Sequence, residues 1–394
     1  MSSHLMATYA RLPVAFERGE GAWLWDTAGN KYLDAVGGVA VCVLGHAHPA
    51  LAQAISEQAH KLLHTSNLYE IPMQNALAEV LAGLAEMDRI FFCNSGAEAN
   101  EAAIKIARSY GRTKSVRNPA IAVMQGSFHG RTLATLSASG NRKVQAGFEP
   151  LVPGFVRVPF NDAEALTSIA RTRPDVVAVL LEPIQGEAGV VIPASGYLSA
   201  VRAICEEQGW LMMLDEVQTG MCRTGEWFAF QHEGIRPDVV ALAKGMGNGL
   251  PIGACLARGI AATVLQTGSH GSTFGGNPLA SRAALTTISV LNEQRLAERT
   301  KLLGQRMLSR LQDAFQDLPV VREVRGKGLM IGIELDRPCT ELVARALSAG
   351  LLINVTAERV IRLLPPLIVS EAEADRIVDS VAALVVQFSQ AADD

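Results

Sequence analysis

The sequence predicts an α/β protein built on a mostly parallel sheet. Short apolar runs bounded by glycine, proline or polar residues are typical of strands buried on both faces. Such runs begin near residues 121, 176, 211 and 239, with helical stretches such as 197–208 between them. Strands that alternate with helices form parallel sheets, and ligands bind at the carboxyl ends of such strands.

The chain is long enough for two domains, and its character changes near residue 285. We predict an N-terminal arm over 1–50, a large domain over 51–284 and a smaller α+β domain over 285–394. The composition, 49% hydrophobic and 19% charged, is that of a globular protein.

The net charge, the hydrophobic runs and the cysteines argue against nucleic-acid binding, membrane insertion and secretion. A net charge of −4 gives no reason to expect nucleic acid or an anionic membrane surface. No apolar run reaches the ~18 residues of a membrane span, and Met1–Arg18 lacks the pattern of a signal peptide. The six cysteines are scattered without a C-x-x-C pair, which suits a reducing compartment. We therefore expect a cytoplasmic protein.

Two histidine pairs near the N-terminus do not predict a metal site. His46 and His48, like His60 and His64, have no cysteine or carboxylate at ligand spacing beside them. We interpret them as ordinary turn or helix histidines and expect no metal. The first 50 residues otherwise indicate an irregular arm with short strands around a turn at 28–30.

An apolar strand at 90–94 leads directly into a helix that begins with Ser95-Gly96-Ala97-Glu98. Ser95 and Glu98 have the spacing of a capping box. The free N–H groups and the positive dipole at a helix start attract anions. Many capped helices bind nothing, so phosphate binding here depends on the neighbouring residues.

Chemically useful side chains follow the later strands. Phe128 and Arg131 follow the strand at 121–124, and Glu187 follows the strand at 176–181. An aromatic ring can cover a flat ligand, and an arginine can hold a carboxylate. The alternative is a core phenylalanine and a surface arginine.

Two further strands end in groups that fit a pyridoxal phosphate site. The run 210–214 ends in Asp215, and the run 239–243 ends in Lys244, which a glycine-rich stretch follows. A lysine by itself could end a strand and extend to water. A buried lysine with a lowered pKa can form a Schiff base, and an aspartate can pair with the pyridinium nitrogen of this cofactor.

The last third predicts the elements of the smaller domain. We expect a helix from Asn292 to Phe315, a hairpin over 320–335 and a short strand at 360–364. Ser370 and Glu373 have capping-box spacing at the start of a final helix.

Together these motifs resemble the class III (subgroup II) pyridoxal-phosphate-dependent aminotransferases, and within them the bacterial acetylornithine aminotransferases. The resemblance covers nearly the whole chain. It rests on the order and spacing of the segments 14–21, 44–49, 94–99, 128–132, 182–187, 214–218, 243–245 and 271–278. It implies fold type I, with a seven-stranded, mostly parallel sheet and a small domain built from both termini.

The resemblance also implies how the cofactor is held. Lys244 would form the Schiff base and carry the proton transfer, and Asp215 would pair with the ring nitrogen. Gln218 would bind the ring hydroxyl. The other residues implied to contact pyridoxal phosphate are Ser95, Gly96, Ala97, Phe128, Glu216, Val217 and Thr273. Thr273, with Ser272 beside it, would reach the site of a neighbouring subunit, which implies a homodimer with shared active sites.

For the substrates, the resemblance implies transfer of the terminal amine of N2-acetyl-L-ornithine to 2-oxoglutarate in arginine biosynthesis. The products would be N-acetylglutamate 5-semialdehyde and glutamate. Arg131 would hold the donor carboxylate, with Ser272 nearby. Glu187 would mask Arg362 while the donor is bound and release it for the keto acid. Ala188 stands where many members have glycine, which could stiffen this loop.

Several related or different functions remain open. Succinylornithine, succinyldiaminopimelate and free ornithine are alternative donors, since enzymes for them share every motif above. A cofactor-binding protein without turnover is disfavoured, because Lys244, Asp215 and Arg131 are all present. A dinucleotide oxidoreductase lacks support since 245–249 is not followed by the third glycine of G-x-G-x-x-G. The sequence contains no G-x-S-x-G motif, so a serine hydrolase has no support either.

Overall fold

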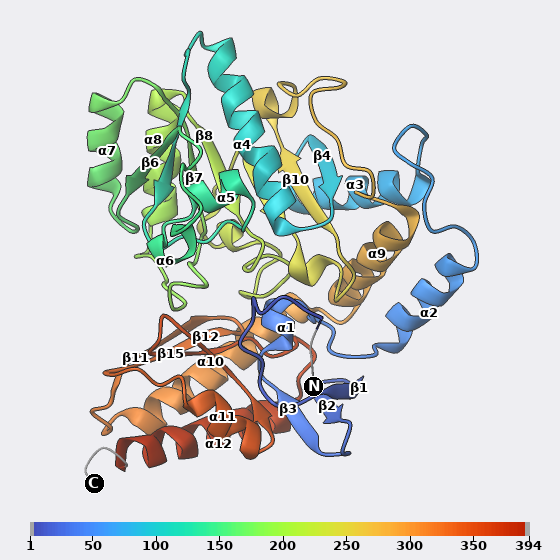
Figure 1. The fold of residues 1–394 in the computed structure, drawn as a ribbon, viewed down its shortest axis with the longest axis vertical. Helices are drawn as coiled ribbons and strands as arrows, with labels where there is room; N and C mark the ends of the chain where they lie inside the picture. The colour runs from blue at the N-terminus through green and yellow to red at the C-terminus, as the bar shows by residue number, and fades with distance from the viewer. Residues whose placement is uncertain (1–3, 391–394) are drawn as a thin grey trace.

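A seven-stranded sheet forms the larger part of the molecule in the computed structural model, which describes residues 4–390 (Figure 1). In spatial order its strands are β4 (Arg89–Cys93), β10 (Gly253–Ala257), β9 (Val239–Leu242), β8 (Leu211–Asp215), β7 (Val176–Leu181), β5 (Ala120–Met124) and β6 (Phe155–Val158). Of these strands, β10 alone runs antiparallel to its neighbours. The predicted mostly parallel sheet is confirmed.

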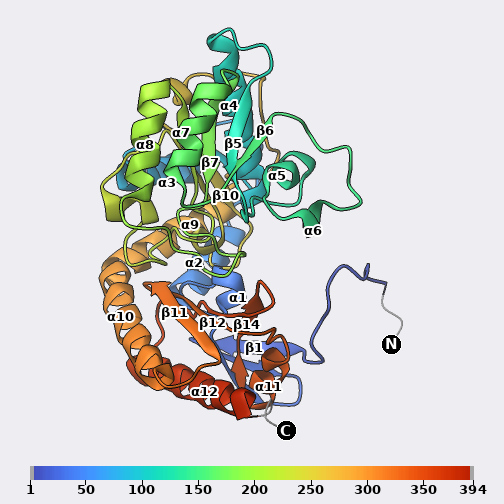
Figure 2. The same cartoon turned by 90° about the vertical axis from the view of Figure 1, so that its left-hand side faces the viewer.

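The central strands are apolar throughout because helices cover both faces of the sheet. On one face α4 (Gly96–Thr113) packs its alanines and isoleucines against β5 and β7. The other face is covered by α3 (Pro72–Ala85), α7 (Ala163–Thr172), α8 (Tyr197–Gln208) and α9 (Pro278–Glu293). Figure 2 shows α7 and α8 together on one side of the strands.

Shorter elements connect these layers. They are α1 (Gly37–Ala40), α2 (Pro49–Ala59), α5 (Leu133–Ala138), α6 (Arg142–Gln145) and the 3₁₀ turns η1 (Ala229–Glu233), η2 (Lys244–Met246) and η3 (Gly259–Ala262). None of the helices within residues 4–390 has the length and apolar character that crossing a membrane requires.

The C-terminal part contains an antiparallel sheet of β11 (Val321–Lys327), β12 (Met330–Leu335), β15 (Val360–Leu363) and β14 (Asn354–Thr356). Helices α10 (Leu296–Phe315), α11 (Leu342–Ser348) and α12 (Glu371–Gln390) complete it. The predicted hairpin and last strand are therefore present. Ser370 and Glu373 form the predicted reciprocal cap of α12.

One predicted helix is wrong at its start. The expected helix from Asn292 to Phe315 is divided, because α9 ends at Glu293 and α10 begins at Leu296. Arg295 between them has a φ of +50°, which a right-handed helix does not allow. The domain boundary predicted at residue 284 falls inside α9.

The N-terminal strands join the C-terminal part. β1 (Phe16–Glu20), β2 (Trp23–Asp26) and β3 (Lys31–Asp34) form an antiparallel set, and β3 pairs in parallel with β13 (Leu351–Leu352). Figure 1 shows this set beside α11 and α12, below the large sheet. Both chain ends thus contribute to the smaller part, as the resemblance implies.

Candidate active site

The carboxyl ends of β4, β5, β7, β8 and β9 lie at one edge of the sheet, around a cavity of about 420 Å³. Parallel strands place the residues that follow them side by side at this edge. Ten of the predicted site residues line the cavity: Ser95, Gly96, Ala97, Phe128, Arg131, Glu187, Asp215, Val217, Gln218 and Lys244.

Lys244 begins the turn η2 directly after β9 and has a φ of +39°. Its side chain lines the cavity, and its amine has no hydrogen-bond partner within residues 4–390. Burial lowers the pKa of Lys244, and the nearby Arg362 lowers it further, although Glu187 opposes the shift. An amine with a lowered pKa loses its proton more readily and becomes a better nucleophile.

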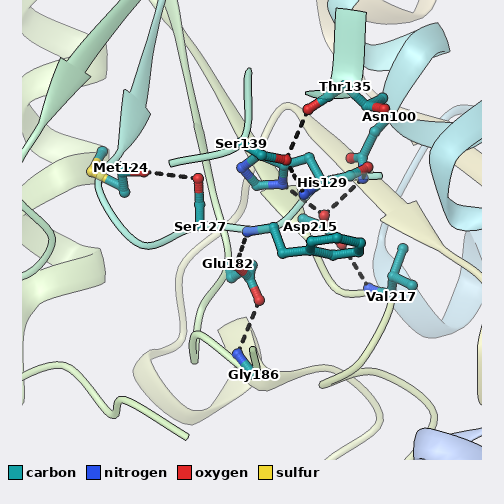
Figure 3. A network of polar contacts seen from close by, with 11 residues as sticks. Asn100, Met124, Ser127, His129, Thr135, Ser139, Glu182, Gly186, Asp215 and Val217 are labelled. Atoms are coloured by element: carbon teal, nitrogen blue, oxygen red, sulfur yellow. Dashed lines mark hydrogen bonds and ion pairs between the residues drawn. The ribbon is translucent and has the colours of Figure 1, made fainter. Parts of the chain in front are cut away.

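Asp215, at the end of β8, is 4% exposed and is fixed by three donors (Figure 3). Its Oδ2 atom accepts a hydrogen bond from Asn100 Nδ2 at 2.7 Å and lies 2.8 Å from His129 Nδ1. Its Oδ1 atom accepts the backbone N–H of Val217 at 3.1 Å. The carboxylate therefore has a fixed orientation, with Oδ1 carrying the smaller number of bonds.

The start of α4, where the sequence predicts an anion site, lines the cavity. Ser95 caps the helix, since its Oγ accepts the backbone N–H of Glu98 at 3.2 Å. The Glu98 carboxylate bonds to the backbone of Asn94 rather than closing the capping box on Ser95. Gly96 is required here, because a Cβ atom would lie 2.7 Å from the Val217 side chain. Free N–H groups at this helix start suit a phosphate.

Phe128 and Val217 provide apolar surface in the same cavity. The guanidinium carbon of Arg131 lies 5.7 Å from the centre of the Phe128 ring, within the range of a cation–π contact. Arg131 has no ion-pair partner within residues 4–390, so its charge is available to a ligand.

Glu187 and Arg362 form the predicted ion pair across the two parts of the molecule, with Oε1 and Nη1 2.6 Å apart. Arg362 is 2% exposed and also donates to Asn354 Oδ1 and, at 3.3 Å, to Gln218 Oε1. Burial acts to raise the pKa of Glu187, but the Arg362 guanidinium outweighs it and the pKa is lowered. The pair is therefore charged and masked in this structure.

Four predicted residues do not line the cavity: Arg362, which contacts it through Glu187 and Gln218, and Ser272, Thr273 and Glu216. Ser272 Oγ accepts hydrogen bonds from Asn94 Nδ2 and from the backbone of Gly275, and Thr273 lies beside it in a separate cavity. Glu216 is buried, and its carboxylate accepts the backbone N–H of Phe230 and the hydroxyl of Thr219. The Glu216 side chain is therefore used within the core, and the contact of Glu216 with the cofactor stays a prediction.

Three residues of the site, Asn100, His129 and Glu182, have no role predicted from the sequence. All three are buried and line the cavity. His129 stands inside the 128–132 motif and Glu182 ends a strand, so their positions are visible in the sequence. Nothing in the sequence indicates that Asn100 and His129 contact Asp215.

The residues present fit pyridoxal phosphate. The half-buried, unpartnered amine of Lys244 suits its aldehyde, and a fixed carboxylate suits its ring nitrogen. The start of α4 suits its phosphate, and the apolar Phe128 and Val217 suit its ring. Pyridoxal phosphate is a small molecule, and a cavity of about 420 Å³ lies within the usual range for such ligands.

Comparisons with known proteins give the same result. The family model for class-III aminotransferases matches residues 5–385. Acetylornithine aminotransferase of Nitrosomonas europaea is 55% identical over 386 residues, which cover 98% of each chain. The crystal structure of N-acetylornithine aminotransferase from Stenotrophomonas maltophilia K279a has a TM-score of 0.85 at 36% identity, covering 97% of this chain and 98% of that one.

A further solved structure bears on the cofactor. Ornithine aminotransferase from Toxoplasma gondii has a TM-score of 0.95 at 33% identity, covering 99% of this chain and 94% of that one. It is described with partial occupancy of pyridoxal phosphate at its active site. The resemblance inferred from the motifs is confirmed, and this chain belongs to the class-III aminotransferase family.

Proposed function

We propose that this enzyme transfers the terminal amine of N2-acetyl-L-ornithine to 2-oxoglutarate, with pyridoxal phosphate as cofactor. The products are N-acetylglutamate 5-semialdehyde and glutamate, which places the reaction in arginine biosynthesis. The observation that carries this proposal is the state of the two arginines. Arg131 has no ion-pair partner within residues 4–390, whereas the Arg362 guanidinium is paired with the Glu187 carboxylate.

This arrangement suits a donor with one carboxylate far from its reacting amine. Arg131 binds that carboxylate, and the masked Arg362 attracts no second one. The acceptor 2-oxoglutarate reacts at the carbon next to its own carboxylate and needs a second cation. Movement of Glu187 away from Arg362 provides it. The identity of 55% to an acetylornithine aminotransferase over nearly the whole chain supports the acetylated donor.

When bound, pyridoxal phosphate supplies an aldehyde that takes up the amine and a ring that withdraws electrons. Lys244 holds the cofactor, then takes a proton from the donor carbon and returns it during transfer. Asp215 keeps the ring nitrogen protonated. Gly96 and Ala97 bind the phosphate through backbone N–H groups, with Ser95 capping the helix. Phe128 and Val217 cover the ring, and Gln218 binds its hydroxyl.

The absorbance spectrum of the purified protein tests this function. N-acetylornithine should bleach the cofactor's yellow band, and 2-oxoglutarate should restore it, since the two half-reactions are separate. Ornithine, succinylornithine and succinyldiaminopimelate, tested in parallel, should react more slowly. If free ornithine reacted fastest, the donor assignment would be wrong. If no band formed with added cofactor, the role of Lys244 would be wrong.

Arg131 should determine the affinity for the donor. Arg131→Ala should raise KM for N-acetylornithine by about 10-fold or more, because it removes a charge-assisted hydrogen bond to a carboxylate. Arg131→Lys is the matched variant, since it keeps the positive charge but cannot form two parallel hydrogen bonds to a carboxylate. Steady-state kinetics of both variants would separate the loss of charge from the loss of bidentate hydrogen bonding. An unchanged KM in Arg131→Ala would move the carboxylate site elsewhere.

We further propose a homodimer in the cytoplasm, with active sites shared between subunits. The exposed apolar residues beside the 272–273 segment are Leu62, Leu63, Leu68, Tyr69 and Phe274. The ring of Phe274 lies 5.3 Å from that of His64, and Asn67 Nδ2 donates to the backbone of Ser272. We call these five residues the apolar patch, since large apolar side chains left exposed are typical of a protein interface. The free state of all six cysteines suits a reducing compartment.

Mixing two inactive variants tests the shared site. Lys244→Ala and Thr273→Ala, unfolded and refolded together, should form hybrid dimers that are more active than either parent. If Thr273 serves the partner's site, one site of each hybrid carries both changes and the other carries neither. If Thr273 serves its own subunit, mixing should give no activity above that of Thr273→Ala.

A further inference from the structure

Glu182 connects two loops at the edge of the cavity (Figure 3). It directly follows β7 and is 5% exposed. One carboxylate oxygen, Oε1, accepts the backbone N–H of Phe128 at 2.8 Å. The other, Oε2, accepts the backbone N–H of Gly186 at 3.0 Å. The first loop carries the ring-covering Phe128, and the second carries Glu187.

Gly186 is tightly placed between Glu182 and the masked ion pair. A Cβ atom on Gly186 would lie 2.3 Å from Gln218 Oε1, so its backbone packs directly on the Gln218 side chain. Gln218 Oε1 in turn accepts a hydrogen bond from Arg362 Nη1 at 3.3 Å. Glu187 is the next residue in the chain, and its carbonyl accepts the hydroxyl of Thr356. A shift of Gly186 would therefore disturb both partners of the ion pair.

We propose that Glu182 is a positioning residue that holds Gly186 and thereby sets the masked state of the Glu187–Arg362 pair. With the Gly186 N–H fixed, Glu187 can leave Arg362 by rotation of its side chain while the loop backbone stays in place. The same carboxylate also fixes the position of the Phe128 loop relative to the Glu187–Arg362 pair. The inference deepens the proposed function and rests on the two half-reactions that it assigns.

Removing the Glu182 carboxylate from water costs free energy, which supports a role for this residue beyond packing. Burial raises its pKa to about 7, and Asp215 adds to the shift while His129 opposes it. A neutral side chain of similar size would avoid that cost. Strongly shifted carboxyl groups that line a cleft are candidates for functional residues.

Glu182→Gln tests the proposal. Glutamine has a single acceptor oxygen, so its NH₂ group must face the N–H of Phe128 or of Gly186, and one loop loses its bond. The donor half-reaction requires the masked state, whereas the acceptor half-reaction begins by opening it. We expect kcat/KM for the donor to fall about 10-fold or more, and kcat/KM for 2-oxoglutarate to fall less than about threefold. Equal losses in both half-reactions would overturn the proposal.

Hydrogen exchange measured by mass spectrometry gives a second readout that does not depend on turnover. In the full-length protein as purified, peptides that cover 126–131 or 184–189 should exchange about 10-fold faster in Glu182→Gln than in the wild type. Unchanged exchange in both segments would also overturn the proposal. These rates do not depend on the donor, so a wrong donor assignment would leave the result standing.

Two further variants complete the design. Asp238→Asn is the matched control, because Asp238 Oδ2 accepts the backbone N–H of Met212 at 2.8 Å at the opposite edge of the sheet. It should change both half-reactions equally and leave exchange in the two loops unaltered. Glu182→Asp keeps the charge but is too short to reach both amides. It should reproduce the unequal losses if Glu182→Gln fails to fold, and equal losses in it would count against the proposal.

Discussion

Replacing Lys244 with alanine should lower the rate of amine transfer by at least about 10⁴-fold, the upper end of what one general acid–base group contributes. Lys244 has two tasks in the proposed function, which are to hold the cofactor and to move the proton. Alanine removes both. The other groups proposed to hold the cofactor, which are the start of α4, Asp215 and the Phe128 loop, remain in place. We therefore expect Lys244→Ala to retain cofactor, but more loosely.

Single-turnover spectra with N-acetylornithine measure this loss, and the cofactor content of the purified variant is measured alongside. Lys244→Arg is the matched variant, since it keeps a long cationic side chain but provides no amine that loses its proton at neutral pH. It should be as inactive as Lys244→Ala. Near-normal turnover in either variant would assign the proton transfer to another group.

The predictable part of this fold is the part that the hydrophobic pattern determines directly. The strands of the large sheet are buried on both faces, so β5, β7, β8 and β9 read as uninterrupted apolar runs. Each run ends at a polar residue, and the first polar residues after the runs are candidates for the site. The hydrophobic pattern is therefore sufficient to locate Lys244 and Asp215.

Contacts between distant segments could not be read from the same pattern. Asn100 and His129 are 115 and 86 positions from Asp215 in the chain, yet both bond to its Oδ2 atom. Their sequence neighbourhoods give no sign of a shared partner. The break between α9 and α10 is unpredictable for a local reason. Arg295 adopts a positive φ where the sequence offers neither glycine nor proline to mark the end of a helix.

The site residues outside the cavity illustrate a third limit. Ser272 and Thr273 are expected at a neighbouring subunit's site, and within one chain they lie in a separate cavity beside the exposed apolar patch. That placement suits a role across an interface, which only the hybrid-dimer experiment tests. Glu216 follows Asp215 directly, but side chains of successive residues at a strand end point to opposite faces. Its carboxylate is therefore turned toward η1 and not toward the cavity.

Asp215→Asn should lower kcat of the donor half-reaction by about 10²–10³-fold, the range found when one preorganised polar group is removed from an active site. The proposed role of Asp215 is to keep the ring nitrogen protonated, and asparagine has no negative charge to do so. The surrounding hydrogen bonds add to this loss of activity, because they fix the orientation of the asparagine amide. Asn100 and His129 both approach Oδ2, so the new amide must place its oxygen there.

The NH₂ group of asparagine then occupies the position of Oδ1. There it faces the backbone N–H of Val217, so two donors are opposed, and the variant has no carboxylate that would keep a ring nitrogen protonated. The fixed orientation that serves the aspartate would thus disfavour the protonated ring in the variant. Asp215→Glu keeps the charge but displaces it by one methylene, so it should retain more activity than Asp215→Asn.

Stopped-flow absorbance with N-acetylornithine measures the rate of the donor half-reaction. Asp238→Asn again serves as the control, since it removes a carboxylate at the opposite edge of the sheet. Cofactor content should fall less than the rate in Asp215→Asn, since the substitution leaves the proposed phosphate contacts at the start of α4 unchanged. An unchanged kcat would mean that the ring nitrogen meets a different partner. In that case the network of Asn100, His129 and Asp215 would serve to hold β8 against α4 and the Phe128 loop, and its place at the cavity would need another explanation.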